Sequence, residues 1–168
     1  MSDSIGAADT SCEAVIAAAD FPVFVVTTRA GAETSGCLVG FTAQVSIYPL
    51  RFLVGLSKRN HTHGVAARAE RLNVHLLGSD RLALATLFGS ETGDEVDKFA
   101  RCAWHPGPDG LPVLDEAAGW FGGAILERHD FGDHTAVLLA PDTGAAPPAD
   151  VSTLRFHMVE HLEPGHDA

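Results

Sequence analysis

The chain has 168 residues and a formal net charge of −11, with 46% hydrophobic and 20% charged residues. This length predicts one domain, and the composition is that of a globular protein, which excludes a disordered acidic chain. The acidic balance also argues against nucleic acid or an anionic membrane as a partner, because both bind basic surfaces.

The charge is unevenly distributed along the chain. Residues 1–20 carry four acidic residues and no Lys or Arg, and residues 156–168 carry three acidic residues. Residues 51–71, which we call the basic segment, hold five basic residues and one acidic residue, a net charge of +4. We therefore predict an acidic N-terminal extension or helix over residues 1–20, a folded domain over 21–162 and a tail over 163–168.

The first half of the chain predicts strands and two helices. Residues 22–28 are dense in β-branched and aromatic residues, and 37–47 return to such composition after a turn, which predicts a long hairpin ending at Tyr48-Pro49. Residues 51–57 predict a third strand and 72–77 a fourth. Asn60 is a candidate cap for a helix over 62–70, and Asp80 for an amphipathic helix over 82–89.

The second half adds strands and few helices. One or two helical turns are predicted within residues 94–100, and prolines and glycines over 104–110 predict a loop. Three strands are predicted over 120–128, 135–140 and 153–161, with turns at 129–133 and 141–150. This pattern indicates a mostly β (α+β) domain, an antiparallel barrel with inserted helices, rather than a doubly wound parallel sheet.

The cysteines and apolar runs indicate the compartment. Cys12, Cys37 and Cys102 are odd in number and widely spaced, which argues against a secreted disulfide framework. The start lacks the basic and apolar regions of a signal peptide, and the longest apolar runs, Pro22–Val26 and Phe52–Leu56, are too short to span a bilayer. We expect a cytoplasmic protein with no membrane partner.

Several catalytic motifs are absent from the sequence. The chain has no Gly-x-Gly-x-x-Gly turn, no Gly-Lys-Ser/Thr phosphate loop and no His-Glu-x-x-His zinc motif. The segment Gly55–Arg59 begins like a nucleophile elbow but lacks the closing glycine, which disfavours a serine hydrolase.

Two close histidine pairs leave a metal site as the less favoured alternative. They are His61 with His63 and His157 with His161, and either spacing puts both rings on one side of a strand. No carboxylate lies beside the first pair in the sequence, and strand alternation turns Glu160 away from the second. We therefore predict hydrogen-bonded or solvated histidines and no metal.

Two stretches at predicted strand ends combine into a candidate anion site. Residues 40–46 end one strand, and residues 56–62 lie between the next strand and its helix; both offer hydroxyl, amide and backbone N–H donors. Lys58 and Arg59 add two cations beside a helix N-terminus, where a phosphate gains charge-assisted hydrogen bonds. The alternative is a solvated basic loop.

A series of short motifs runs through residues 21–140: Phe21–Thr28, Gly40–Ala43, Val45–Ile47 with Pro49, Arg51–Ser57 with Asn60 and Thr62, Leu72–Leu77, Phe88, Lys98-Phe99, Trp104, Gly110–Leu114 and Gly132–His134. Their order and spacing resemble the flavin reductase-like domains of the FMN-binding split-barrel class. The resemblance implies an antiparallel split β-barrel that forms a homodimer and reduces FMN or FAD with NADH or NADPH. It also implies a flavin-dependent monooxygenase as the partner that receives the reduced flavin.

The resemblance also implies a set of site residues. The strand that lies along the isoalloxazine ring contains Thr42, Ala43, Gln44, Val45 and Ser46, and the loop that takes the ribityl phosphate contains Ser57, Lys58, Arg59, Asn60 and Thr62. Lys98 and Phe99 resemble a later segment of the flavin site. His134 resembles the residue near the nicotinamide, which orients the nucleotide rather than transferring a proton; the alternative is a locally bonded turn histidine.

Three other functions stay open at this point. The chain departs from the usual family residues at Gln44 and Tyr48, beside the expected flavin. One alternative is a flavin-binding electron carrier or sensor without pyridine-nucleotide reductase activity. Another is a non-catalytic dimeric interaction module, and a third is a barrel that holds a deazaflavin, pyridoxal phosphate or haem, because a fold does not fix its cofactor.

Overall fold

A computed structural model describes residues 10–165. Its helices, strands and 3₁₀ turns (η) are, in chain order, α1 Thr10–Ala18, β1 Phe24–Ala30, β2 Glu33–Val39, β3 Thr42–Ser46, β4 Arg51–Ser57, α2 His61–Ala66, β5 Arg71–Leu76, α3 Leu82–Ser90, η1 Lys98–Ala100, β6 Trp104–Pro106, η2 Pro108–Gly110, β7 Pro112–Leu114, β8 Gly119–Phe131, β9 His134–Ala145 and α4 Phe156–Val159.

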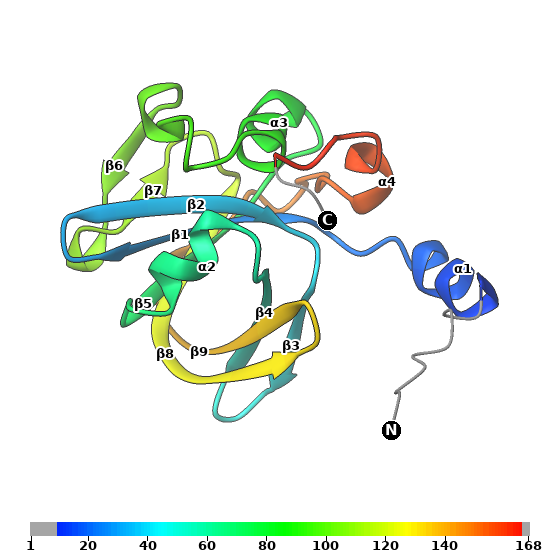
Figure 1. The fold of residues 1–168 in the computed structure, drawn as a ribbon, viewed down its shortest axis with the longest axis horizontal. Coiled ribbons are helices and arrows are strands. Elements are labelled where there is room, and N and C mark those ends of the chain that lie inside the picture. The colour runs from blue at the N-terminus through cyan, green and yellow to red at the C-terminus, as the bar shows by residue number, and fades with distance from the viewer. Residues whose placement is uncertain (1–9, 166–168) are drawn as a thin grey trace.

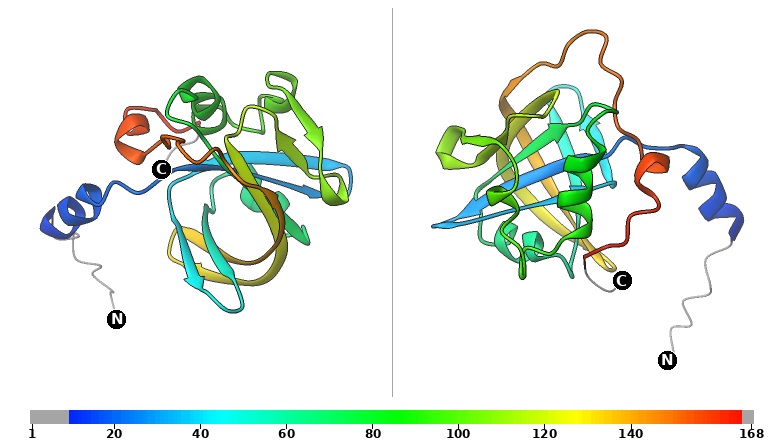
Figure 2. Two further views of the ribbon diagram at one scale, coloured as in Figure 1. Left: turned by 180° about the vertical axis from the view of Figure 1, so that it is seen from behind. Right: turned by 90° about the horizontal axis from the view of Figure 1, so that it is seen from above.

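Seven of the strands form one antiparallel sheet in the order β2-β1-β5-β8-β9-β4-β3, and β6 pairs with β7 in a second, two-stranded sheet. The large sheet curls on itself, α3 and α4 lie together beside it, and α1 stands away from the body (Figure 1). The two further views in Figure 2 show the same separation of α1 from the sheet. The predicted mostly β (α+β) class is confirmed.

β1 is buried on both faces from Val25 to Thr28, which explains the apolar residues at its start. Val26 packs with Val54, Leu72 and other residues of β2, β4, β5 and β9 inside the curl of the sheet. Its neighbour Val25 faces the opposite side and packs with Phe88 of α3 and other residues of a second cluster. Successive side chains of a strand point to opposite faces, so a strand covered on both sides carries apolar or hydrogen-bonded side chains on both faces. The buried hydroxyls of Thr27 and Thr28 donate to backbone carbonyls.

His75 of β5 lies in the second cluster with no exposed surface. Its Nδ1 donates to the carbonyl of Val25 at 3.0 Å, and its Nε2 accepts from the backbone N–H of Leu114 at 3.2 Å. Both ring nitrogens are therefore satisfied when the imidazole is neutral. Burial lowers the pKa of His75 to about 4.

The predicted hairpin over residues 22–47 is shorter than expected. β1 pairs with β2, but β3 pairs with β4 at the opposite edge of the sheet. The chain crosses between the two edges at Gly40 and Phe41, where the carbonyl of Phe41 accepts from the N–H of Gly55 at 2.7 Å. Composition alone does not reveal this crossing, because the residues on both sides of it are suited to strands.

The prediction of a strand over residues 153–161 is wrong. Thr153 and Arg155 form isolated bridges with Gly78 and Pro22, and residues 156–159 form the short helix α4. Leu154 and Val159 are buried in the second cluster, so the apolar residues that suggested a strand instead pack against α3 and its neighbours.

Several boundaries also differ from the sequence prediction. The predicted loop over 104–110 contains β6 and η2, and α2 ends at Ala66 rather than at residue 70. Arg128 donates to the carbonyls of Ala66 and Ala69 and so satisfies the chain as it leaves the helix. β8 and β9 extend to Phe131 and Ala145 through the turns predicted there, and Asp80 makes no side-chain cap for α3.

Other predictions are confirmed. β4 covers residues 51–57 as predicted, and Asn60 caps α2, its side chain accepting from the N–H of Thr62. The division into residues 1–20, 21–162 and 163–168 stays a prediction, and its positions 1–9 and 166–168 lie outside the described residues. Between residues 10 and 165, no helix is both long enough and apolar enough to cross a membrane.

Candidate functional site

Two pockets meet at the crossing between β2 and β3. We call the first, of about 580 Å³, the apolar pocket, and the second, of about 470 Å³, the strand-end pocket. Both are lined by the same six residues, Gly40, Phe41, Gly55, Asp133, His134 and Phe156. The two pockets, which together we call the cleft, therefore adjoin, and these six residues border both of them.

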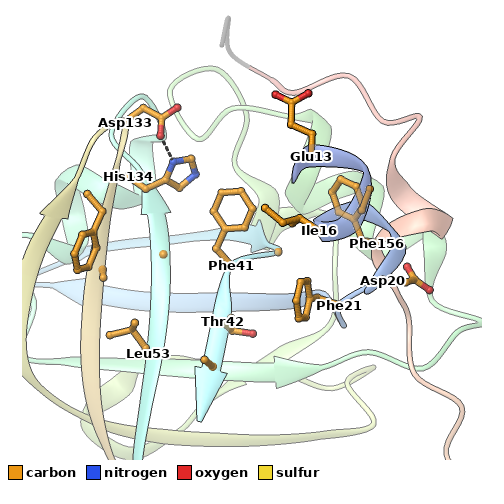
Figure 3. A pocket seen from close by; sticks show the side chains of 16 residues that line it. Glu13, Ile16, Asp20, Phe21, Phe41, Thr42, Leu53, Asp133, His134 and Phe156 are labelled. Carbon is orange, nitrogen blue, oxygen red and sulfur yellow. Dashed lines mark hydrogen bonds and ion pairs between the residues drawn. The ribbon is translucent and has the colours of Figure 1, made fainter. Parts of the chain in front are cut away.

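The apolar pocket lies between α1 and the outer face of the sheet edge (Figure 3). Besides the shared residues it is lined by Glu13, Ile16, Ala17, Asp20, Phe21, Thr42, Ala43, Leu53, Phe131 and Ala136. No Lys or Arg appears among these described lining residues, and most of them are aliphatic or aromatic. A pocket of this kind suits a flat, uncharged ring system.

The strand-end pocket carries the polar groups. Ser57 ends β4, and Arg59 and Asn60 connect it to α2; all three line this pocket. The loop is held in shape because Ser57 Oγ accepts from the N–H of Arg59 at 3.4 Å and Asn60 Oδ1 accepts from the N–H of Thr62 at 3.0 Å. A guanidinium, a hydroxyl and an amide at one place suit an anionic group such as a phosphate.

Phe41 stands where the two pockets join. Its ring is 60% exposed and lies 4.8 Å from the ring of His134, centroid to centroid. A Cβ atom at Gly55 would lie 3.0 Å from the Cβ of Phe41, which is tighter than ordinary contact. A larger residue at position 55 would therefore displace Phe41 from β4 by a few tenths of an ångström.

His134 begins β9, directly after the β8–β9 turn at Gly132, whose φ is +84°. Its Nδ1 donates to Asp133 Oδ1 at 2.7 Å, and this hydrogen bond holds the pKa of the Asp133 carboxyl below its usual range. The N–H of Lys58 donates to the carbonyl of Asp133 at 2.9 Å, which ties the turn to the end of β4. The imidazole is thus oriented from both sides of the cleft.

The structure brings together five of the predicted binding residues around the cleft. Thr42 and Ala43 line the apolar pocket, and Ser57, Arg59 and Asn60 line the strand-end pocket. Gln44, Val45 and Ser46 continue β3 beyond the pocket lining, and Gln44 Nε2 donates to the carbonyl of Ser46 at 3.2 Å. Their predicted contact with a ring stays a prediction.

Four other predicted residues make contacts within the chain. Thr62 is fully buried and its hydroxyl hydrogen-bonds Ser35 Oγ at 2.8 Å, and Lys58 pairs with Asp130 at 3.5 Å. Lys98 is 4% exposed, its ammonium donates to the carbonyls of Gly36 and Phe88, and burial lowers its pKa. Phe99 packs in the second cluster, and its carbonyl accepts from the indole of Trp104.

The charge of the basic segment is largely neutralised by partners from elsewhere in the chain. Arg68 donates to Glu33 at 2.6 Å, and Arg71 pairs with Asp142 at 2.5 Å and with Asp109 at 3.3 Å. Among the described cations of this segment, Arg59 is the one that lines the strand-end pocket. The candidate anion site is therefore bordered by fewer cations than the net charge of +4 suggested.

Three histidines of the two pairs, His61, His63 and His157, form hydrogen bonds. The two ring nitrogens of His61 face Asp94 at 2.7 Å and Glu33 at 3.1 Å, and His63 Nε2 lies 2.8 Å from Thr135 Oγ1. His157 Nδ1 pairs with Asp20 at 2.6 Å, in a helix rather than in the predicted strand. Across residues 10–165, no group of three or more His, Cys, Asp or Glu side chains is placed to hold a metal ion.

Sequence reasoning missed the residues that reach the cleft from distant segments. Ile16 comes from α1, Phe131 from the end of β8 and Phe156 from the start of α4. Phe131 could have been singled out from the sequence. It is a large apolar residue directly before the Gly132-Asp133 turn, where an exposed polar residue is expected. Nothing local distinguishes Ile16 or Phe156.

The comparisons with known proteins agree with this architecture. The chain is 28% identical over 124 residues to an FMN reductase (NADH) RutF of Methylorubrum extorquens, covering 74% of the chain and 60% of that protein. The chain spans 37% to 61% of the first three curated relatives that it matches.

Solved structures share the fold. The NADH:FAD oxidoreductase SgcE6 of Streptomyces globisporus C-1027 superposes with a TM-score of 0.75 at 24% identity, over 90% of this chain and 91% of that one. An FMN-binding protein of Thermus thermophilus superposes with a TM-score of 0.70 at 27% identity, over 74% and 70% of the two chains. A family model described as flavin reductase like domain matches residues 18–158, and the chain therefore belongs to the flavin reductase like domain family.

Proposed function

We propose that the protein is an NAD(P)H-dependent flavin reductase that acts on FMN or FAD and supplies the reduced flavin to a partner monooxygenase. The observation that carries the proposal is the pair of adjoining pockets, an apolar pocket beside a strand-end pocket lined by Ser57, Arg59 and Asn60. A flavin has the same two parts, a flat apolar ring and a phosphate at the end of a polar chain. The name of the RutF relative also supports the proposal.

Each part of the cleft has a role in this proposal. Thr42 and Ala43 lie along the ring, and Ser57, Arg59 and Asn60 hold the phosphate. The other predicted contacts, from Gln44, Val45, Ser46, Lys58, Thr62, Lys98 and Phe99, stay predictions. In the overall reaction a hydride from the reduced pyridine nucleotide and a proton from water convert the oxidised flavin to the reduced flavin.

His134 has a positioning role in this proposal. Its ring is held by Asp133 and by Phe41 and borders both pockets, where it can orient the pyridine nucleotide against the flavin. Hydride transfer needs two rings stacked at about 3–3.5 Å and no acid or base at the reacting carbon. No proton transfer is therefore assigned to His134.

A spectrophotometric assay tests the proposed activity. Purified protein mixed with FMN or FAD should oxidise NADH or NADPH, seen as loss of absorbance at the nicotinamide band. Absence of turnover with every combination of flavin and nucleotide would overturn the proposal. A protein that purifies with tightly held FMN but oxidises neither nucleotide would instead be an electron carrier, the function that the likeness to the Thermus thermophilus FMN-binding protein favours.

We also propose that the protein works in the cytoplasm as a homodimer. β3 is an edge strand, and the turn after it exposes Ile47 at 86%, Tyr48 at 97% and Leu50 at 46%. Exposed apolar patches on an open sheet edge usually mark an interface, and a symmetric pair of copies covers both patches at once. The partner monooxygenase is the other candidate for this surface.

The homodimer makes a direct prediction for Tyr48. Tyr48→Asp places a charge on the exposed patch and should convert a dimer into a monomer, measured by size-exclusion chromatography with light scattering. The mutation should not unfold the chain, because the side chain is 97% exposed. Arg101→Asp, on a distant exposed residue, is the control and should leave the dimer intact. A wild-type monomer at micromolar concentration would contradict the dimer.

A further inference from the structure

Helix α1 is the least packed element of the structure. None of its nine residues is buried, although six of them are Ala, Val, Ile or Cys, and Val15 and Ile16 are 72% and 61% exposed. An isolated helix of this length is marginally stable in water and depends on packing against something else. The apolar side chains of α1 therefore need a surface that the chain alone does not provide.

α1 faces the apolar pocket from the side opposite the sheet. Glu13, Ile16 and Ala17 line the pocket, and Thr42 and Leu53 line its other wall, with the space of about 580 Å³ between them (Figure 3). In the close-up, Ile16 is the α1 side chain directed toward Phe41 and Phe156. The pocket is therefore a slot with a strand on one side and a helix on the other.

The C-terminal end of α1 is fixed to α4. Asp20 adopts a positive φ of 48°, and its carboxylate accepts from the N–H of His157 at 2.9 Å and pairs with His157 Nδ1 at 2.6 Å. Arg155 donates to the carbonyl of Asp20, and the N–H of Phe156 donates to the carbonyl of Phe21. α1 is thus held at one end and set at a defined distance from the sheet.

We infer that α1 forms the outer wall of the binding site for the nicotinamide ring of the hydride donor, and that Ile16 is the side chain that packs against this ring. The inference rests on the proposed function. In the proposed function the phosphate lies at Ser57 and Arg59, at the end of β4, and the flavin ring lies along Thr42 and Ala43 on the sheet side of the slot. The hydride donor must then stack on the free face of that ring, which is the face turned toward α1.

A pair of neighbouring variants tests this assignment. Ile16→Ser should raise the KM for the reduced nucleotide by about tenfold, the effect expected when one partly buried aliphatic contact is lost, and should leave FMN affinity within about twofold. Val15→Ser is the matched control, because Val15 is on the same helix and exposed but does not line the pocket. FMN affinity is measured by quenching of flavin fluorescence and KM by steady-state kinetics.

A second measurement is independent of turnover. In the FMN-loaded protein, saturating NAD⁺ should slow amide hydrogen exchange over residues 10–19 in the wild type and in Val15→Ser, and should not do so in Ile16→Ser. A parallel rise in the Kd for FMN would place α1 against the flavin and overturn the assignment. An unchanged KM, or dissociation of a dimer by Ile16→Ser, would overturn it as well. If the wild type oxidises no nucleotide, the proposed function itself fails.

Discussion

Replacing Arg59 with alanine should weaken FMN binding by about ten- to a hundredfold, the range expected for loss of one charge-assisted hydrogen-bonded contact with a phosphate. Arg59 is the cation of the basic segment that lines the strand-end pocket. Riboflavin, which lacks the phosphate, should bind the variant and the wild type equally well. Both affinities are read from quenching of flavin fluorescence.

Lys58 provides the matched control for Arg59. It is the preceding residue in the chain and carries the same charge, but it lines neither pocket, and its ammonium lies 3.5 Å from Asp130. Lys58→Ala should therefore change FMN affinity by less than about threefold, since an exposed ion pair contributes little. An equal loss for FMN and riboflavin in Arg59→Ala, or a larger loss in Lys58→Ala, would show that the phosphate does not lie where we propose.

The stability of the fold should fall as the pH drops from about 6.5 toward 4, because of His75. The pKa of His75 is lowered from 6.5 to about 4 by burial, so the unfolded chain takes up a proton in this range and the native protein does not. Its contribution is complete above pH 6.5 and is lost progressively below it, to a total of about 3 kcal/mol. Urea unfolding at several pH values measures this slope.

His75→Gln separates this effect from other acid-sensitive groups. The variant keeps polar atoms at position 75 but should be less stable than the wild type at pH 7.5. Because glutamine cannot titrate, the variant should lose little further stability between pH 7.5 and pH 4.5. His129→Gln is the control, because His129 is exposed and pairs with Glu127. Carboxylates with lowered pKa values, such as Asp133 and Asp142, contribute mainly below pH 4. An unaltered slope in His75→Gln would refute the assignment.

The parts of the site that depend on adjacent residues could be predicted from the sequence. β4 is bounded by Pro49 before it and by the polar run that starts at Ser57, and Asn60 caps the next helix through its own side chain. Ser57, Arg59 and Asn60 therefore come together wherever this strand and this helix form. The motif resemblance placed Thr42 and Ala43 in the same cleft.

The parts that depend on tertiary packing could not be predicted. Nothing in the sequence around Lys98 indicates that its ammonium is buried against the carbonyls of Gly36 and Phe88. Arg71 pairs with Asp142, which lies 71 residues later in the chain. The net charge of a sequence segment therefore does not give the electrostatic field around that segment in the folded protein. Residues 153–161 have strand-like composition, but they fold as bridges and a short helix.

The two-residue crossing at Gly40 and Phe41 links the site to the integrity of the sheet. β2 and β3 occupy opposite edges, yet only these residues separate them along the chain, and both line the two pockets. If the two edges of the sheet, β2 and β3, move apart, the cleft must therefore be distorted. A ligand that fits the cleft stabilises the arrangement in which the two edges lie together. Tight binding and slow local unfolding at β2 and β3 are therefore two aspects of one equilibrium.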